Sequence, residues 1–106
     1  MWNLIKKAAR KTSAYNIKIN TRTLISITNS ADEKIQKQET LSSRELKEVR
    51  KSQESLMKDI ILFLSNNGSM EEVENIINAE SKKYKTTRGA EIAIKHVIES
   101  TKSLKK

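Results

Sequence analysis

The chain has 106 residues, a formal net charge of +8, and neither cysteine nor proline. A chain of this length is expected to form one domain, over residues 1–106, with a modest core. Without cysteine there is no disulfide framework, no thiol nucleophile and no zinc site of the usual kind, which fits a cytoplasmic protein. The surplus of positive charge favours a polyanionic partner.

The scarcity of helix breakers predicts an all-α protein. Gly68 and Gly89 are the only glycines, and chains with so few breakers are usually helical. We therefore expect a compact bundle of four or five helices around a central helix at about 43–67. No apolar run reaches the roughly 18 residues that a membrane span requires.

Residues 2–15 are predicted to form a short basic amphipathic helix. Trp2 and Ile5 lie on its apolar face, and its other side carries Lys6, Lys7, Arg10 and Lys11. We favour a helix that Trp2 and Ile5 dock on the core. The alternative is an amphipathic anchor that lies on a membrane surface.

Residues 16–29 carry two competing patterns. Residues 16–20 alternate as a half-buried strand would, and the stretch that follows is rich in β-branched residues. Leu24, Ala31 and Ile35, however, recur at helical spacing. Because a lone strand cannot satisfy its backbone, we expect a linker at 16–20 and a helix from about Thr21 to Lys37. A short hairpin is the alternative.

The strongest helical pattern follows a polar loop. An apolar stripe recurs every three or four residues through Leu46, Val49, Gln53, Leu56, Ile60 and Phe63. Ser42 and Glu45 predict a capping box at its start, and residues 66–68 (Asn-Asn-Gly) predict its end.

Two further helices are predicted after Gly68. Ser69 and Glu72 form a second capping box, and the acidic cluster of residues 71–74 suits the first turns of a helix. The last helix begins at Thr86 or Thr87. Gly89 is either a tolerated first-turn residue or a point of close helix approach, and the basic tail at about 102–106 is expected to fray.

Catalytic and metal-binding patterns are absent from the sequence. His96 is the only histidine, and it has no evident nucleophile or orienting carboxylate. The glutamates of residues 71–74 match no calcium-loop spacing, and there is no glycine-rich phosphate loop. We therefore expect no enzyme activity, no cofactor and no metal.

The order of elements from Asp59 to Ile98 resembles helix-turn-helix and winged-helix DNA-binding domains: an apolar helix, an Asn/Gly break, a Ser-capped helix, a basic turn and a last helix. The segment before the last helix is longer than the usual turn, and no wing follows. The resemblance implies that the last helix reads DNA, with Arg88 and Glu91 nearest the base edges.

Charge is concentrated in two segments. Residues 1–31 hold six basic residues and no acid, and residues 82–106 hold eight basic residues and two glutamates. The sequence therefore predicts a small nucleic-acid-binding protein that uses phosphate contacts, although its four aromatic residues are fewer than base stacking would favour. The predicted contacts are Lys6, Lys7, Arg10, Lys11, Lys82, Lys83, Lys85, Thr87, Arg88 and Lys95.

The alternative function is that of a protein-binding module. Such a module would be an adaptor, a chaperone-like protein or an immunity-like protein, and it would bind an acidic protein partner. Small lysine-rich bacteriocin immunity proteins are similar in size and charge. A homodimer formed across the stripe of residues 46–63 belongs to the same class.

Overall fold

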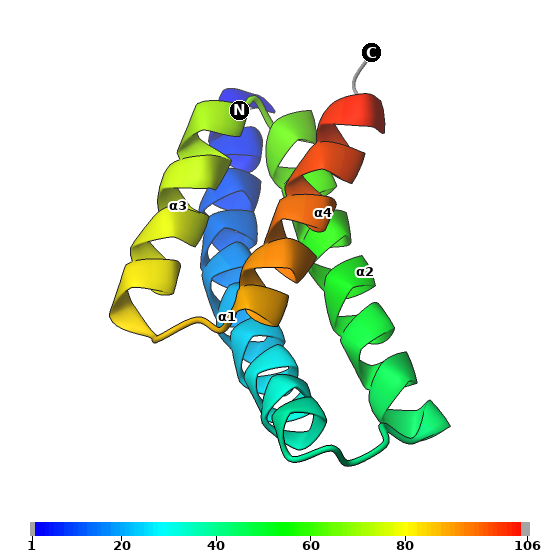
Figure 1. Cartoon of the computed structure of the whole chain (residues 1–106). Coiled ribbons are helices and arrows are strands. Elements are labelled where there is room, and N and C mark those ends of the chain that lie inside the picture. The colour runs from blue at the N-terminus through cyan, green and yellow to red at the C-terminus, as the bar shows by residue number, and fades with distance from the viewer. Residues whose placement is uncertain (1, 105–106) are drawn as a thin grey trace.

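The computed structural model describes residues 2–104 and consists of four helices joined by short loops (Figure 1). They are α1 (Trp2–Gln36), α2 (Ser43–Ser65), α3 (Met70–Lys83) and α4 (Arg88–Leu104). No strand occurs within residues 2–104, so the all-α bundle is confirmed. The last two residues of the predicted basic tail, Lys105 and Lys106, lie outside the described residues.

Helix α1 is one continuous helix of 35 residues. The predicted linker at 16–20 and the alternative hairpin are both wrong. Ile17, Thr21, Leu24 and Thr28 are buried on one face, and the Thr21 and Thr28 hydroxyls donate to the carbonyls of Ile17 at 2.7 Å and of Leu24 at 2.6 Å. Burial on the other helices therefore outweighs the weak strand preference of these β-branched residues.

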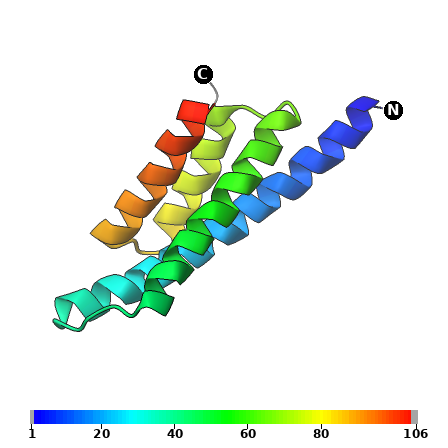
Figure 2. The same ribbon diagram turned by 90° about the vertical axis from the view of Figure 1, so that its right-hand side faces the viewer.

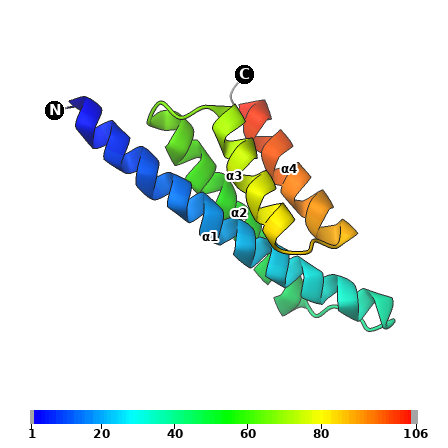
Figure 3. The same ribbon diagram turned by 90° about the vertical axis from the view of Figure 1, so that its left-hand side faces the viewer.

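Helix α1, rather than α2, packs extensively against each of the other three helices. Helix α2 packs mainly on α1 and α4, so its predicted place at the centre of the bundle is not confirmed. Figures 2 and 3 show α1 crossing the whole molecule, whose longest dimension is 55 Å. A helix of 35 residues is about 52 Å long, so α1 alone spans that dimension.

The core lies where the helices overlap. It takes Leu56, Ile60 and Phe63 from the predicted stripe of α2, whereas Leu46 in the same stripe is exposed. The first turns of α2 lie beyond the start of α4, beside the end of α1 alone (Figure 1). The rest of the buried apolar cluster is Ile17, Leu24, Ile25, Val73, Ile77, Ala93, Ile94 and Val97.

The predicted capping boxes of α2 and α3 are confirmed. At each start a serine hydroxyl accepts from the backbone N–H of the glutamate three residues on, and that carboxylate accepts from the serine N–H. At the end of α2, Asn67 adopts the left-handed conformation, with φ of 70°. A Cβ on Gly68 would lie 2.3 Å from the Phe63 ring, so packing rather than backbone conformation requires this glycine.

The start of α4 is held on α1. The Asp32 carboxylate accepts from the Gly89 N–H at 2.8 Å, and the Asn29 side chain bonds both Lys85 O and Thr87 N. A Cβ on Gly89 would lie 2.3 Å from Asp32 Oδ1. Gly89 is therefore a point of close helix approach, the second of its two predicted roles.

The first eleven described residues, 2–12, form an N-terminal arm of α1 that contains no buried residue. Trp2 is 67% exposed and Ile5 is 58% exposed, so the prediction that they dock on the core is wrong. Arg10 is level with Asn66 at the end of α2. Because α1 is inclined to the other helices, the arm leaves the bundle beyond that point (Figures 2 and 3).

Candidate nucleic-acid interface

Four cations follow one flank of α1. Lys7, Lys11, Lys18 and Arg22 are separated by four, seven and four residues, which places them in one row along a continuous helix. We call this row the α1 basic stripe. It covers fifteen residues of rise, or about 22 Å, and it contains no acidic residue.

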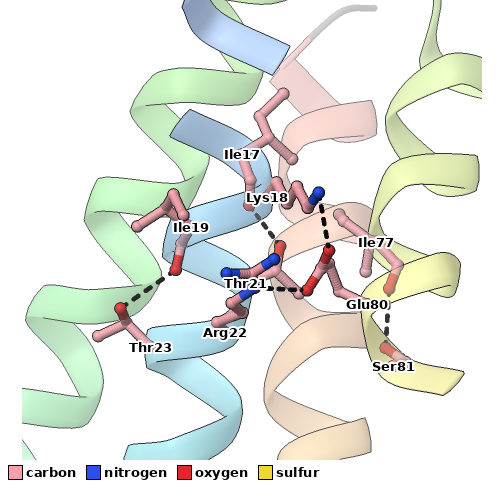
Figure 4. A network of polar contacts seen from close by, with 9 residues as sticks. All are labelled: Ile17, Lys18, Ile19, Thr21, Arg22, Thr23, Ile77, Glu80 and Ser81. Carbon is pink, nitrogen blue, oxygen red and sulfur yellow. Dashed lines mark hydrogen bonds and ion pairs between the residues drawn. The ribbon is translucent and has the colours of Figure 1, made fainter. Parts of the chain in front are cut away.

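The C-terminal end of the stripe, at Lys18 and Arg22, is bound to α3 by a buried carboxylate (Figure 4). Glu80 has a side chain that is only 4% exposed, and its Oε2 accepts from Arg22 Nε at 2.8 Å. Lys18 Nζ lies 3.9 Å from the other carboxylate oxygen. A buried carboxylate is tolerated when it is paired in this way, and the hydrogen bond that Arg22 donates to Glu80 raises the pKa of Arg22.

Two tyrosines lie among these cations. The Arg22 guanidinium lies 5.3 Å from the centre of the Tyr84 ring, and Lys83 Nζ lies 5.8 Å from the same ring. Tyr15 is exposed and occupies the flank of α1 between Lys11 and Lys18. Aromatic rings interleaved with cations can stack on unpaired bases while the cations contact phosphates.

The fold brings part of the two predicted basic segments together. Lys83, at the end of α3, reaches the α1 basic stripe through Tyr84 and Arg22. Lys7 and Lys11 lie on the stripe itself. Within residues 2–104, no carboxylate oxygen lies within 4.0 Å of the ammonium groups of these three lysines.

The other predicted contacts are dispersed. Arg10 Nη1 donates to Asn66 O at 3.2 Å, so Arg10 caps the end of α2, where the helix dipole favours a cation. The Thr87 hydroxyl accepts from the Ala90 N–H and caps α4. Lys6 lies over the Trp2 ring. Lys85 is exposed in the loop, Arg88 lies on the outer side of α4, and Lys82 and Lys95 line a groove.

The structure adds four residues that sequence reasoning missed: Tyr15, Lys18, Arg22 and Tyr84. The predicted linker at 16–20 hides the common register of Lys18 and Arg22 with Lys7 and Lys11. A linker breaks the 3.6-residue period, so cations on its two sides have no fixed relation. The spacing of the four cations is the signal that would have found the stripe.

Helices α3 and α4 run side by side in opposite directions in all three views (Figures 1–3). This is an αα-hairpin, whereas the two helices of a helix-turn-helix motif meet at about 90–120°. The packing of α3 and α4 therefore differs from the arrangement that the sequence resemblance implied. The start of α4, held down by Asn29 and Asp32, gives no support to its use as a recognition helix.

A groove of about 610 Å³ runs between α3 and α4. Ile94 and Ile98 supply its apolar part, and both charge signs line its walls, including the ion pair of Lys102 with Glu74 at 2.7 Å. The groove exists because α3 and α4 each pack on α1 and have little contact with one another.

Residues 2–104 contain no cluster of three or more histidine or acidic side chains that could hold a metal ion. His96 is exposed on α4. None of the four helices is both long enough and apolar enough to cross a membrane, as judged on the described residues.

Comparisons of the chain with protein-family models, with curated proteins and with solved structures find no match.

Proposed function

We propose that this protein is a small non-enzymatic nucleic-acid-binding protein that contacts the sugar-phosphate backbone through the α1 basic stripe and Lys83. The observation that carries the proposal is the row of four cations over about 22 Å of one rigid helix. That length corresponds to roughly six steps of a nucleic-acid strand at 3.4 Å per step. A row of cations at this scale can neutralise several successive phosphates.

The geometry favours binding that does not depend on base sequence. The start of α4 is bonded to Asn29 and Asp32 and capped by Thr87, so these groups are not free to contact base edges. The cations therefore supply affinity, and Tyr15 and Tyr84 supply rings for stacking. Because stacking needs unpaired bases, we expect single strands to bind at least as tightly as duplexes.

Salt titration tests the phosphate contacts. Five contacts give a slope of about −4.5 in log affinity against log salt for a duplex and about −3.5 for a single strand, so affinity should fall about a hundredfold or more over a roughly fourfold rise in salt. Fluorescence anisotropy of labelled single-stranded and duplex oligonucleotides measures it. Absence of binding to both at low salt, or binding that salt does not weaken, would contradict the proposal.

A pair of double variants separates the stripe from general charge. Lys7→Gln with Lys11→Gln removes two exposed cations of the stripe, and Lys47→Gln with Lys58→Gln removes two exposed cations of α2. The first pair should reduce the salt slope by about two, while the second leaves it almost unchanged. Equal losses in both variants would show that overall charge, rather than the stripe, binds the nucleic acid.

A second candidate function is protein binding in the groove between α3 and α4. The apolar side chains of Ile94 and Ile98 lie there among lysines and glutamates in equal number, which suits a partner helix with an apolar stripe and flanks of both charge signs. Ile98→Asp tests this candidate in a pull-down from nuclease-treated extract. Loss of one specific partner in this variant, with oligonucleotide binding retained, would favour the protein-binding function.

A further inference from the structure

The outward face of α1 carries no charge over most of the helix. Counting every three or four residues, this face consists of Ile5, Ala8, Thr12, Tyr15, Ile19, Thr23, Ser26 and Ser30. All of them are exposed except Ile19, which is partly buried. Exposed helix faces usually carry charged residues, so an uncharged face of eight positions calls for an explanation.

Ile5 is the apolar end of this face in the N-terminal arm, and Leu4 and Trp2 flank it on its two sides. Leu4 is 68% exposed, and Trp2 and Ile5 are exposed almost as much. A terminal helix usually turns its apolar side to the core and its charges to water. The arm does the reverse: Arg10 turns back to the end of α2, and the apolar side chains are left facing outward.

Cations border the outward face. The α1 basic stripe runs along one side. On the other side, Lys51 and Glu48 of α2 line a shallow hollow with Thr23 and Ile27, so this border carries both charge signs. No acidic residue occurs between Trp2 and Ala31. None of the eight positions of the face is buried, so this face is not covered by the rest of the described chain.

We propose that α1 lies along the surface of an anionic lipid bilayer, with Trp2, Leu4 and Ile5 in the headgroup boundary and the bordering lysines on the lipid phosphates. An exposed apolar face beside cations is the pattern of helices that lie in the membrane interface, and tryptophan is enriched at that level. Each lysine near an anionic surface adds attraction. The inference goes beyond nucleic-acid binding, which needs none of the apolar side chains of the arm.

Charge complementarity favours a lipid surface over a second copy of the chain. A symmetric dimer through this face would bring the cationic borders of two copies together. The segment between Trp2 and Ala31 contains no carboxylate to compensate them, and the nearest carboxylates of α2, Glu45 and Glu48, already pair with Lys34 and Arg44. Anionic headgroups supply the compensating charge.

The single tryptophan of the chain makes the test direct, because Trp2 lies in the proposed contact. The full chain, treated with nuclease, is titrated with vesicles of phosphatidylcholine and with vesicles of equal parts phosphatidylcholine and phosphatidylglycerol. We expect the Trp2 emission to shift to the blue and the protein to sediment with the anionic vesicles, with binding about tenfold or more weaker to the neutral ones. Unchanged emission together with no sedimentation would overturn the proposal.

Matched variants test the apolar contribution. Leu4→Ser with Ile5→Ser should weaken vesicle binding about tenfold or more and leave oligonucleotide binding unchanged. Leu46→Ser with Ile92→Ser replaces an exposed leucine and an exposed isoleucine elsewhere and should leave vesicle binding unchanged. Equal vesicle binding by the two double variants would show that charge alone attracts the protein, and the proposed insertion would be wrong.

A further variant tests the orientation of α1. Ser26 is exposed on the outward face, far from the arm. Ser26→Glu should weaken binding to anionic vesicles if the whole helix lies on the surface, because it brings an anion to the headgroups. Unaltered binding, or a lipid-free dimer in which the Trp2 emission is already shifted to the blue, would overturn the orientation proposed here.

Discussion

Two regions of α1 have the same secondary structure and opposite environments. Residues 13–31 contain the seven buried residues of the helix, whereas the arm of residues 2–12 contains none. Both regions have helical spacing and lack glycine and proline. The comparison teaches that local sequence is enough to continue a helix, whereas burial depends on whether other elements lie alongside.

The two regions also differ in how they use polar side chains. In residues 13–31, the hydroxyls of buried Thr21 and Thr28 donate hydrogen bonds to backbone carbonyls one turn earlier. These buried hydroxyls therefore need no partner on another helix. In the arm, Thr12 makes the same bond to Ala8 O at 3.1 Å but is exposed. The same local hydrogen bond is therefore needed in one region and optional in the other.

The largest expected effect compares two leucines of this one helix. Leu24 is fully buried and Leu4 is exposed. We expect Leu24→Ala to reduce the free energy of unfolding by about 2–5 kcal/mol, because it leaves a cavity between helices. Leu4→Ala should change it by less than about 0.5 kcal/mol.

Urea unfolding followed by circular dichroism measures both free energies. A cost above about 1 kcal/mol for Leu4→Ala would show that the arm packs on the bundle in solution, and the contrast between the two regions of α1 would disappear.

A smaller effect is expected where residues 13–31 meet the start of α4. Alanine in place of an interior helix glycine normally stabilises by up to about 1 kcal/mol. At position 89 the added Cβ would displace the Asp32 carboxylate from the Gly89 N–H. We therefore expect Gly89→Ala to destabilise the protein by about 1 kcal/mol, the usual cost of a lost cap.

A double-mutant cycle with Asp32→Ala sharpens this test. With the carboxylate removed, Gly89→Ala should become neutral or stabilising, so the two substitutions are coupled by about 1 kcal/mol. Additive effects would show that Asp32 does not fix α4 on α1.

The smallest expected effect concerns pH. Asp59 faces Asn20, which donates to its carboxylate. Burial raises the pKa of Asp59 above its usual 3.8, and the bond from Asn20 opposes this shift. The folded state therefore binds this proton more readily than the unfolded chain, so the ionised carboxylate lowers stability above the raised pKa and this cost disappears as pH falls below 3.8.

Asp59→Asn keeps an acceptor for Asn20 and removes the charge. We expect a small gain in stability at neutral pH that disappears in acid, seen in urea midpoints at several pH values. A loss of stability at neutral pH would show that the Asp59 charge is favourable in the fold.

Glu45 is a contrasting carboxylate with the opposite sign. The Lys34 ammonium and the Ser42 cap lower the pKa of Glu45 from 4.5 to about 2. The stability that it contributes is therefore present above about 4.5 and lost as pH falls toward 2. In Glu45→Gln the acid destabilisation of the protein should be weaker over that range, and an unchanged acid profile would contradict this account.

Much of the fold could be predicted because its signals are local. The capping boxes at Ser42 and Ser69, and the break after Ser65, each lie within a few residues of sequence. The apolar stripe of α2 was correct from Leu56 to Phe63 and failed at Leu46. The stripe records which side of a helix can be buried, but not how far a neighbouring helix extends along it.

The candidate site could be predicted only in part for a related reason. Charge clustering was enough to predict Lys7, Lys11 and Lys83 as contacts. Predicting Lys18 and Arg22 required knowing that α1 is continuous, which fixes their register with the other cations. The pairing of Arg22 with Glu80 joins residues 58 positions apart, which no local pattern contains. The predicted contacts also include Arg10 and Thr87, whose polar groups are used in capping.

The sequence by itself determined the helical class, the capped starts of α2 and α3, the buried side of the second half of α2 and the excess of positive charge, because each depends on residue type and short-range spacing. Only the tertiary structure decided that residues 16–20 belong to a helix, that α1 is the helix on which the others pack, and that the apolar side of the arm faces outward. Those features depend on which distant segments pack against one another. The free energy that stabilises them comes from tertiary contacts, which do not exist until the chain is folded.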